Sequence, residues 1–238
     1  LMRAPKGAVF VAGLLRASAG ATGATARLSV AARATDAGGQ ATSVPAREMS
    51  APPEGDGSLL ASWGLALAPG RHTVTLAAQV GDRGSTTTLD VDVPDLGGAV
   101  LAASPLVLYP EEPPASGAPD PRDPFGALQL GPMRLHPRFG NVFTPADALM
   151  VVATVHGGAL DPATGQAALR ARFTVLKDGR PVARGAEDAF ATADAVASVG
   201  PIPLSDYPPG AYVVRLDVTD KASGRTLRQE APLEIRKP

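Results

Sequence analysis

Apolar and polar residues alternate along most of this chain with a period of two, the pattern of a strand that buries one face in a core. The clearest example is the segment 212–218, where four apolar residues share one face and two charged residues share the other: Tyr212, Val214, Leu216 and Val218 against Arg215 and Asp217. Turn signals separate such runs, which predicts short antiparallel strands. We expect strands at 8–15, 26–34, 41–47, 59–67, 72–80, 85–93, 99–108, 127–133, 149–155, 169–175, 181–184, 195–202, 212–218 and 227–235.

One block of turn and strand occurs twice at a constant spacing. Pro69, Gly70, Val74, Leu76 and Gly84 correspond to Pro209, Gly210, Val214, Leu216 and Gly224. Pro-Gly reverses a chain at little steric cost, because proline presets φ and glycine accepts a positive φ. The repeat predicts an all-β chain of two tandem immunoglobulin/fibronectin-like antiparallel β-sandwich domains, at residues 1–95 and 96–238.

The residue two places after each Pro-Gly differs between the copies. Tyr212 predicts a tyrosine corner, in which the hydroxyl at the head of a late strand bonds back to the main chain. His72 holds the same place in the first copy, so we expect a less secure bond there.

Several stretches predict local features. Residues 149–155 form a continuous apolar run, which is typical of a central strand with both faces covered, and Asp178-Gly179 predicts a hairpin turn. Trp63 falls on an inward face and is expected to anchor the first core. Residues 110–126 hold six prolines, which predicts an exposed Pro-rich loop, and the alanine-rich segment 188–197 leaves room for a turn of helix.

Composition narrows the function classes. The 238 residues carry a net charge of -1, which offers no basic surface for nucleic acid or for an anionic membrane. Cysteine is absent, so disulfides, thiol nucleophiles and thiolate metal sites are excluded. No apolar run approaches the ~20 residues of a membrane helix, so we expect a chain that does not span a membrane. Residues 2–19 have two interpretations, a short signal peptide or a first strand, and the strand is favoured because Arg16 ends the apolar run.

Candidate chemistry is sparse. His72 is expected to be a satisfied core histidine, whereas His136 and His156 lie in loop contexts that predict exposure. A calcium site was weighed at Asp217, Asp220 and Glu230, but alternate carboxylates on a strand are usually solvated, as we also expect for Asp90 and Asp92. Five arginines would form a cationic stripe if their strands adjoin, although interleaved acids favour a salt-bridged surface: Arg170, Arg172, Arg215, Arg225 and Arg228. We therefore predict no catalytic, cofactor-binding or metal-binding residues and no enzyme activity.

The order of several strings resembles a known family. The strings are PGRHTVTLAAQVGDRGSTTTLDVDVPDL, VFTPADALMVVATV, FTVLKDGRPV and IPLSDYPPGAYVVRLDVTDKASGRTLRQEAPLEI, with a Pro-rich insertion after the first. Together they resemble the C-terminal β-sandwich region of the von Willebrand factor type A-related proteins of acidobacteria and similar bacteria. The resemblance covers most of residues 58–238. It implies no metal site, because the Asp-x-Ser-x-Ser motif of the A domain is absent and Leu60 stands where 56–60 would need its second serine.

These observations predict a non-catalytic structural or protein-interaction module of a bacterial envelope or extracellular protein. Its expected partners are other protein chains or further domains of the same polypeptide, and its expected location is secreted or in the cell envelope. The alternative is a carbohydrate-binding tandem β-sandwich, which needs exposed aromatic residues such as Tyr109 or Phe139. An enzyme with dispersed catalytic residues would need a pocket that holds His136 beside two carboxylates.

Overall fold

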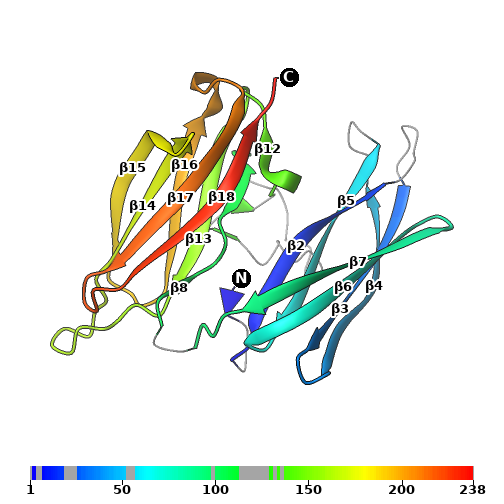
Figure 1. Ribbon diagram of the computed structural model, residues 1–238, viewed down its shortest axis with the longest axis horizontal. Helices are drawn as coiled ribbons and strands as arrows, with labels where there is room; N and C mark the ends of the chain where they lie inside the picture. Colours follow the sequence, from blue (N-terminus) through cyan, green and yellow to red (C-terminus); the bar gives the residue numbers. More distant parts are fainter. Residues whose placement is uncertain are drawn as a thin grey trace. The chain divides into compact units, whose positions relative to one another are not determined.

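The computed structural model consists almost wholly of β-strands, which confirms the all-β prediction (Figure 1). It describes residues 2–3, 7–18, 26–51, 57–97, 100–112, 129–130, 133–134 and 137–237. The chain forms two compact units, one of Leu1–Asp95 with Ser116–Arg134 and the other of Leu96–Ala115 with Leu135–Pro238. No helix in the described ranges is long and apolar enough to cross a membrane.

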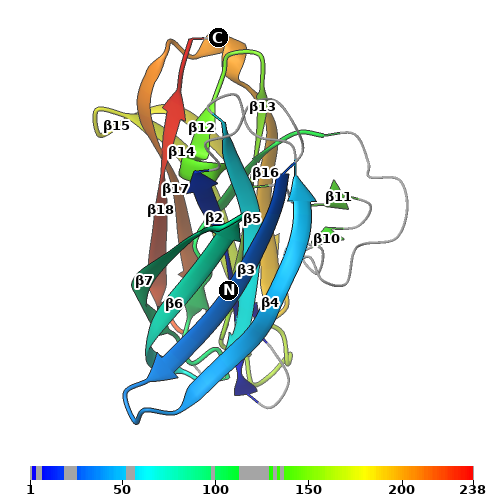
Figure 2. The ribbon, with the colours of Figure 1, turned by 90° about the vertical axis from the view of Figure 1, so that its right-hand side faces the viewer.

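The first unit is a sandwich of two antiparallel sheets. One sheet has the order β1-β2-β5, from Met2–Arg3, Val9–Ser18 and Ser58–Leu67. The other has the order β4-β3-β6-β7, from Ala41–Ala51, Ala26–Asp36, Gly70–Val80 and Arg83–Val93. Figure 2 shows this second sheet facing the viewer, with β4 and β7 at its two edges.

The second unit pairs a five-stranded sheet with a four-stranded one. The first has the order β12-β18-β17-β14-β15, from Val142–Phe143, Thr226–Ile235, Gly210–Asp220, Leu169–Lys177 and Arg180–Phe190. The second has the order β16-β13-β8, with β9 also paired to β13, from Ala195–Pro203, Ala148–His156, Ala102–Ala103 and Val107–Pro110. Short 3-10 turns lie at Phe139–Asn141 and Leu204–Asp206. The remaining strands, β10 and β11, are a two-stranded pair at Gln129–Leu130 and Met133–Arg134, which belong to the first unit.

The two units share one strand order. In each, the Pro-Gly corner opens a strand, β6 or β17, that lies between the next strand along the chain and an earlier one, β3 or β14. That earlier strand also pairs with the strand that follows it in the chain, β4 or β15. The strand before the corner, β5 or β16, lies in the opposite sheet, where it pairs with β2 or β13. The repeat seen in one corner therefore extends to six strands of each unit.

The period-2 pattern places the cores where the sequence predicts them. In β17 Tyr212, Val214, Leu216 and Val218 are all buried, and they join residues of the opposite sheet in one apolar cluster. In the central strand β13 almost every residue is buried, so both faces are covered as predicted. In the first unit Leu28, Val30, Leu59 and Ala61 form the corresponding cluster, and Trp63 on β5 is also buried.

Both corners close in the same way. The Tyr212 hydroxyl donates to the Pro208 carbonyl oxygen at 2.6 Å, and the His72 Nε2 lies 2.8 Å from the Ala68 carbonyl oxygen. Each bond joins the side chain to the carbonyl four residues earlier. The weaker bond expected at His72 is not seen, because an imidazole nitrogen reaches the same acceptor as a phenol.

We expect Gly210→Ala to lower the free energy of unfolding of the second unit by about 1–2 kcal/mol, because Gly210 has a φ of 150° that side chains avoid. An added Cβ would lie 3.7 Å from the Lys177 Nζ, an ordinary contact, so the cost comes from the backbone alone. All three tyrosines lie in the second unit and Trp63 lies in the first, so the near-ultraviolet circular dichroism transition that Trp63 fluorescence does not share reports the second unit during urea unfolding.

The control for this corner is Gly185→Ala on β15, whose φ is not positive and whose added Cβ would meet the Phe173 carbonyl oxygen at 3.6 Å. We expect it to stay within about 0.5 kcal/mol of the parent. Equal stabilities for the two variants would show that the turn does not depend on glycine.

Other local predictions have mixed outcomes. Asp178 and Gly179 form the predicted two-residue hairpin, with φ of 51° and 74°. The single strand expected at 99–108 is divided into β8 and β9, because Ser104 leaves the ladder and bonds Thr154 through its backbone and hydroxyl. The helical turn allowed at 188–197 is wrong, since β15 runs to Phe190 and β16 begins at Ala195. Of the Pro-rich loop 110–126, residues 113–126 lie outside the described residues.

Candidate interaction surface

The residues that suggested chemistry are mostly engaged in structural bonds. His72 is 6% exposed and holds the first corner, as a satisfied core histidine. His136 lies outside the described residues. For Asp217, Asp220 and Glu230, the structure does not bring the three carboxylates into one cluster, and it groups no three metal-ligating side chains anywhere in the described ranges.

His156 is a correction to the sequence interpretation. It was expected to be exposed beside Gly157-Gly158, but it is 7% exposed at the end of β13. Its Nδ1 lies 3.2 Å from Asp194 Oδ1, and its Nε2 lies 3.1 Å from Thr154 Oγ1. The order hydroxyl, imidazole, carboxylate is that of a nucleophilic triad. Here Thr154 lies within a paired strand and its N–H donates to the Ser104 Oγ, so the group ties β13 to the turn before β16.

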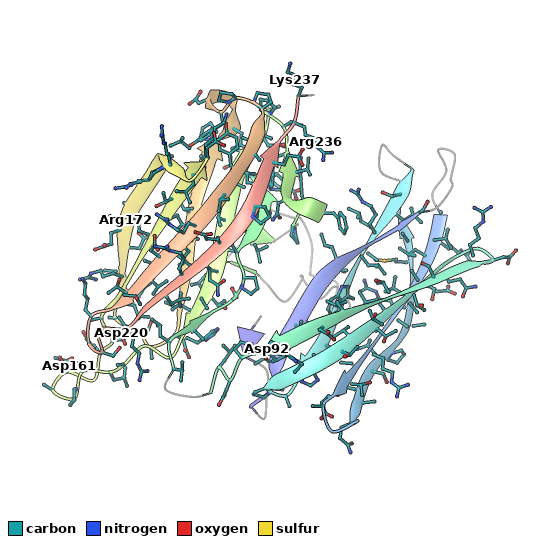
Figure 3. The ribbon with its side chains drawn as sticks, in the orientation of Figure 1. Asp92, Asp161, Arg172, Asp220, Arg236 and Lys237 are labelled. Atoms are coloured by element: carbon teal, nitrogen blue, oxygen red, sulfur yellow. The ribbon has the colours of Figure 1, made fainter. Side chains whose placement is uncertain are left out.

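Asp220 is the most deeply buried carboxylate among the described residues, at 1% exposure (Figure 3). It accepts hydrogen bonds from the Ala159 N–H at 2.9 Å, the Ala222 N–H at 3.0 Å and the Ser223 Oγ at 2.5 Å. Burial alone would raise the pKa of Asp220, but these bonds outweigh burial and leave its pKa below the ordinary value. The carboxylate therefore acts as a clamp between the loop before β14 and the β17–β18 turn.

A signal for Asp220 was present in the sequence. It continues the inward phase of Tyr212, Val214, Leu216 and Val218, so it falls on the core side of β17 rather than on the solvated side. An acid at an inward position next to Ser223 and Gly224 indicates a side chain that caps its own turn. The expectation that Asp220 is solvated is therefore wrong, because the phase of the strand places this side chain on the core side.

The predicted arginine stripe exists as a salt-bridged surface. Strands β14, β17 and β18 adjoin, and ion pairs join Arg172 to Glu187 at 3.3 Å and Arg228 to Asp217 at 2.8 Å. Arg215 also lies 3.0 Å from Asp217. These acids neutralise the outer face of the second unit's larger sheet, as the sequence predicts.

The corresponding face of the first unit has small uncharged residues in these places. The strand registers align Ser29, Ala31, Thr75, Ala77 and Thr86 with Arg170, Arg172, Arg215, Asp217 and Arg228. A shallow groove of about 420 Å³ lies there, lined by Ser29, Ala31, Ala46, Ala77, Ala78, Gln79, Gly84, Ser85 and Thr86. The two units thus share a strand order but present chemically different faces.

The edge of this sheet at β7 carries the two acids expected to be solvated. Asp90 and Asp92 are exposed, and Asp90 Oδ1 accepts a 2.9 Å bond from the Thr73 hydroxyl (Figure 3 labels Asp92). Both side chains lie on the outer face, whereas Leu89, Val91 and Val93 point toward the core side. The edge is therefore amphipathic along its C-terminal half.

The aromatic residues considered for sugar binding are placed differently. Tyr109 is 3% exposed on β9, and burial raises the pKa of its hydroxyl. Phe139 is 36% exposed in the 3-10 turn before β12. Tyr109 therefore does not present its ring to a saccharide in this structure.

Comparison with known proteins gives no family. No family model matches the chain, and no curated protein matches it. A solved structure among those found by the comparison is described as a tetra-tandem repeat in the extending region of a large adhesion protein. The two share 12% identity at a TM-score of 0.32, over 95% of this chain and 50% of that chain. The chain thus spans half the length of that structure, and its fold assignment rests on its own strands and core.

Proposed function

We propose that this chain is a non-catalytic structural or protein-interaction module, built from two immunoglobulin-like sandwiches, in a secreted or cell-envelope protein of a bacterium. The strand order supports the immunoglobulin-like assignment. In each unit a three-strand group, β1-β2-β5 or β8-β13-β16, faces a four-strand group, β4-β3-β6-β7 or β15-β14-β17-β18. The corner side chain stands at the head of the strand where a tyrosine corner belongs.

One observation carries the proposal of a non-catalytic role. The side chains that a catalytic interpretation would use hold the fold together: His72 closes a corner, His156 bonds Thr154 and Asp194, and Asp220 caps a turn. Exposed side chains lie on long strands, where they suit contact with another polypeptide. The envelope location rests on the resemblance to von Willebrand factor type A-related proteins, as does the bacterial source.

The test is chemical cross-linking of the tagged protein in cells of its source, followed by mass spectrometry. We expect reproducible cross-links to one polypeptide, or to further domains of the same one, from lysines in either unit. Hydrolysis of a chromogenic acetate ester by the purified protein, abolished by His156→Ala in a variant that still folds, would instead identify an enzyme and overturn the proposal.

The carbohydrate-binding alternative draws no support from the aromatic residues. Tyr109 contributes to the packed side of β9, and Phe139 is a single partly exposed ring rather than part of a platform in the described residues. A glycan array probed with the whole chain separates the alternatives. A carbohydrate-binding protein should bind a glycan and lose that binding in Phe139→Ala, whereas a protein-interaction module should show no such binding.

A further inference from the structure

The long edge strands β4, β5, β15 and β16 each carry a feature that blocks pairing with another chain. A proline or a break in register serves this purpose, because either one interrupts the row of backbone donors and acceptors. Pro45 and a register shift interrupt β4, Pro181 and two shifts interrupt β15, and Pro201, Pro203 and a shift interrupt β16. On β5 the Arg47 guanidinium donates to the Ser62 carbonyl oxygen at 3.3 Å.

Strand β7 has none of these features. It is 11 residues long, pairs with β6 in unbroken register from Arg83 to Val93, and contains neither proline nor lysine. Within the described part of the chain no strand pairs with its other side. Residues 85–89 are Ser-Thr-Thr-Thr-Leu, an uncharged run rich in β-branched residues that favours strand pairing.

The equivalent strand in the second unit shows what covers such an edge. There β12 pairs in parallel with the end of β18, placing Val142 beside Glu234 and Phe143 beside Ile235. Phe143 is fully buried, and the Arg236 N–H donates to its carbonyl oxygen at 2.9 Å. The side chain of Asn141 adds a 3.0 Å bond to the Pro232 carbonyl. An extended segment with a buried apolar side chain therefore covers the C-terminal end of this edge.

We propose that the free edge of β7 binds an extended amphipathic segment of a partner polypeptide, which adds a strand to the sheet. This inference rests on the proposed function and names its surface. On the core side the added strand continues the row of Leu89 and Val91, both only half-buried, so it presents apolar residues there. On the outer face it lies beside Asp90 and Asp92, so it presents lysine or arginine. Backbone pairing supplies affinity and the alternating side chains supply specificity.

A second copy of the same chain is a poorer occupant. Antiparallel pairing of two β7 strands about Thr88, which overlaps the whole strand, places Asp90 opposite Thr86 and Asp92 opposite Gly84, so neither acid gains a basic partner. Pairing about Thr87 instead places Asp82 of each chain opposite Asp92 of the other. Like charges opposite one another destabilise a ladder. Charge complementarity therefore favours a basic segment from a different polypeptide.

The experiment uses the whole chain and synthetic peptides of about ten residues. Valine alternates with threonine, and two lysines replace threonines at the N-terminal end in one peptide and at the C-terminal end in another. A third peptide has glutamates in place of the lysines. By fluorescence anisotropy we expect a lysine peptide to bind with a Kd between about 10 μM and 1 mM, and the glutamate peptide to bind at least about tenfold more weakly. Which of the two lysine peptides binds more tightly shows whether the bound peptide runs parallel or antiparallel to β7, because Asp90 and Asp92 lie near the C-terminal end of that strand.

Hydrogen exchange locates the bound peptide. We expect slower exchange at β7 amides and unchanged exchange at β4, the other edge of the same sheet. Asp90→Lys should reverse the preference between lysine and glutamate peptides, whereas Glu48→Lys on β4 should leave it unchanged. Alternate backbone N–H groups of β7 point away from β6, so either Thr86→Pro or Thr87→Pro removes a donor on the free side of the strand. That variant should unfold at the same urea concentration as the parent but no longer bind the peptide.

The inference is overturned by no binding of any peptide at about 1 mM, by a preference that ignores Asp90→Lys, or by protection at β4 instead of β7. Protection of β7 in the peptide-free protein that rises with protein concentration identifies a second copy as the occupant, and also overturns it. If the cross-links to a partner come from other surfaces, the proposed function as an interaction module is retained and only the binding role of the β7 edge is rejected.

Discussion

Replacing Asp220 by asparagine is expected to lower the free energy of unfolding of the second unit by about 3 kcal/mol. The carboxylate is 1% exposed and accepts bonds from three donors on two separate segments, at Ala159, Ala222 and Ser223. Asparagine turns an NH₂ group toward some of these donors, so buried N–H or O–H groups lose their acceptor. Urea unfolding followed by the tyrosine signal gives the difference.

The same variant should change the acid response. The folded pKa of Asp220 is lowered, so its stabilisation is fully present above its unfolded pKa of about 4 and is lost as the pH falls through the folded value. The parent should therefore lose stability below about pH 4 more steeply than Asp220→Asn. Identical slopes for the two proteins would show that this carboxylate does not contribute to acid unfolding.

Asp178→Asn is the matched control for Asp220→Asn. Asp178 lies in the exposed hairpin turn with a φ of 51°, a conformation that asparagine adopts readily. We expect its stability to stay within about 0.5 kcal/mol of the parent.

Gly13→Val is expected to destabilise the first unit by about 3 kcal/mol. Gly13 on β2 is paired with Trp63 on β5, and a Cβ at position 13 would lie 2.9 Å from three atoms of the indole. Trp63 is 7% exposed, so its ring has no free space into which to move. The fluorescence of Trp63, the single tryptophan of the chain, reports unfolding of this unit.

Two further variants test the contact. Gly84→Val is the control, because an added Cβ there lies 3.8 Å from the Ala78 carbonyl oxygen on an exposed strand, and we expect little change. In the Trp63→Leu background Gly13→Val should cost at least about 1 kcal/mol less, because the two residues are in contact. Unfolding of the Trp63→Leu proteins, which lack tryptophan, is followed by circular dichroism. If the destabilisation by Gly13→Val is the same with and without Trp63, Gly13 does not pack on the indole.

Local pattern predicts much of this fold because strands and tight turns are encoded by neighbours in sequence. The alternation in β17, the apolar run of β13 and the Asp178-Gly179 turn each depend on residues a few places apart. The two corners were visible for the same reason. What local pattern leaves open is which strand pairs with which.

The errors have that origin. His156 is buried because β8 and β16 flank the end of β13, a pairing that the glycines after it do not reveal. The division of 99–108 depends on a bond between Ser104 and Thr154. Strand β12 escaped prediction because two residues carry no period, and its place beside β18 is fixed by distant Pro232 and Arg236.

The candidate surface was harder to predict than the core. Sequence identified Asp90 and Asp92 as solvated and the arginines as salt-bridged, from charge and strand phase alone. It did not identify the open edge of β7, because an edge is defined by the strand that is missing beside it. Comparing the two units makes the edge visible, since β18 is covered where β7 is not.

The shared strand order also sets the course of folding. The hairpins β6–β7, β14–β15 and β17–β18 join neighbours in sequence and close short loops, and each corner bond spans four residues. The pairings β3–β6 and β14–β17 instead bring together strands separated by two others. Because a long loop must close before such a pairing gains contacts, these pairings limit the rate, and each unit should fold in about milliseconds to seconds. We therefore expect the hairpins and corners to form first, and the pairing of β3 with β6, or of β14 with β17, to complete each sandwich.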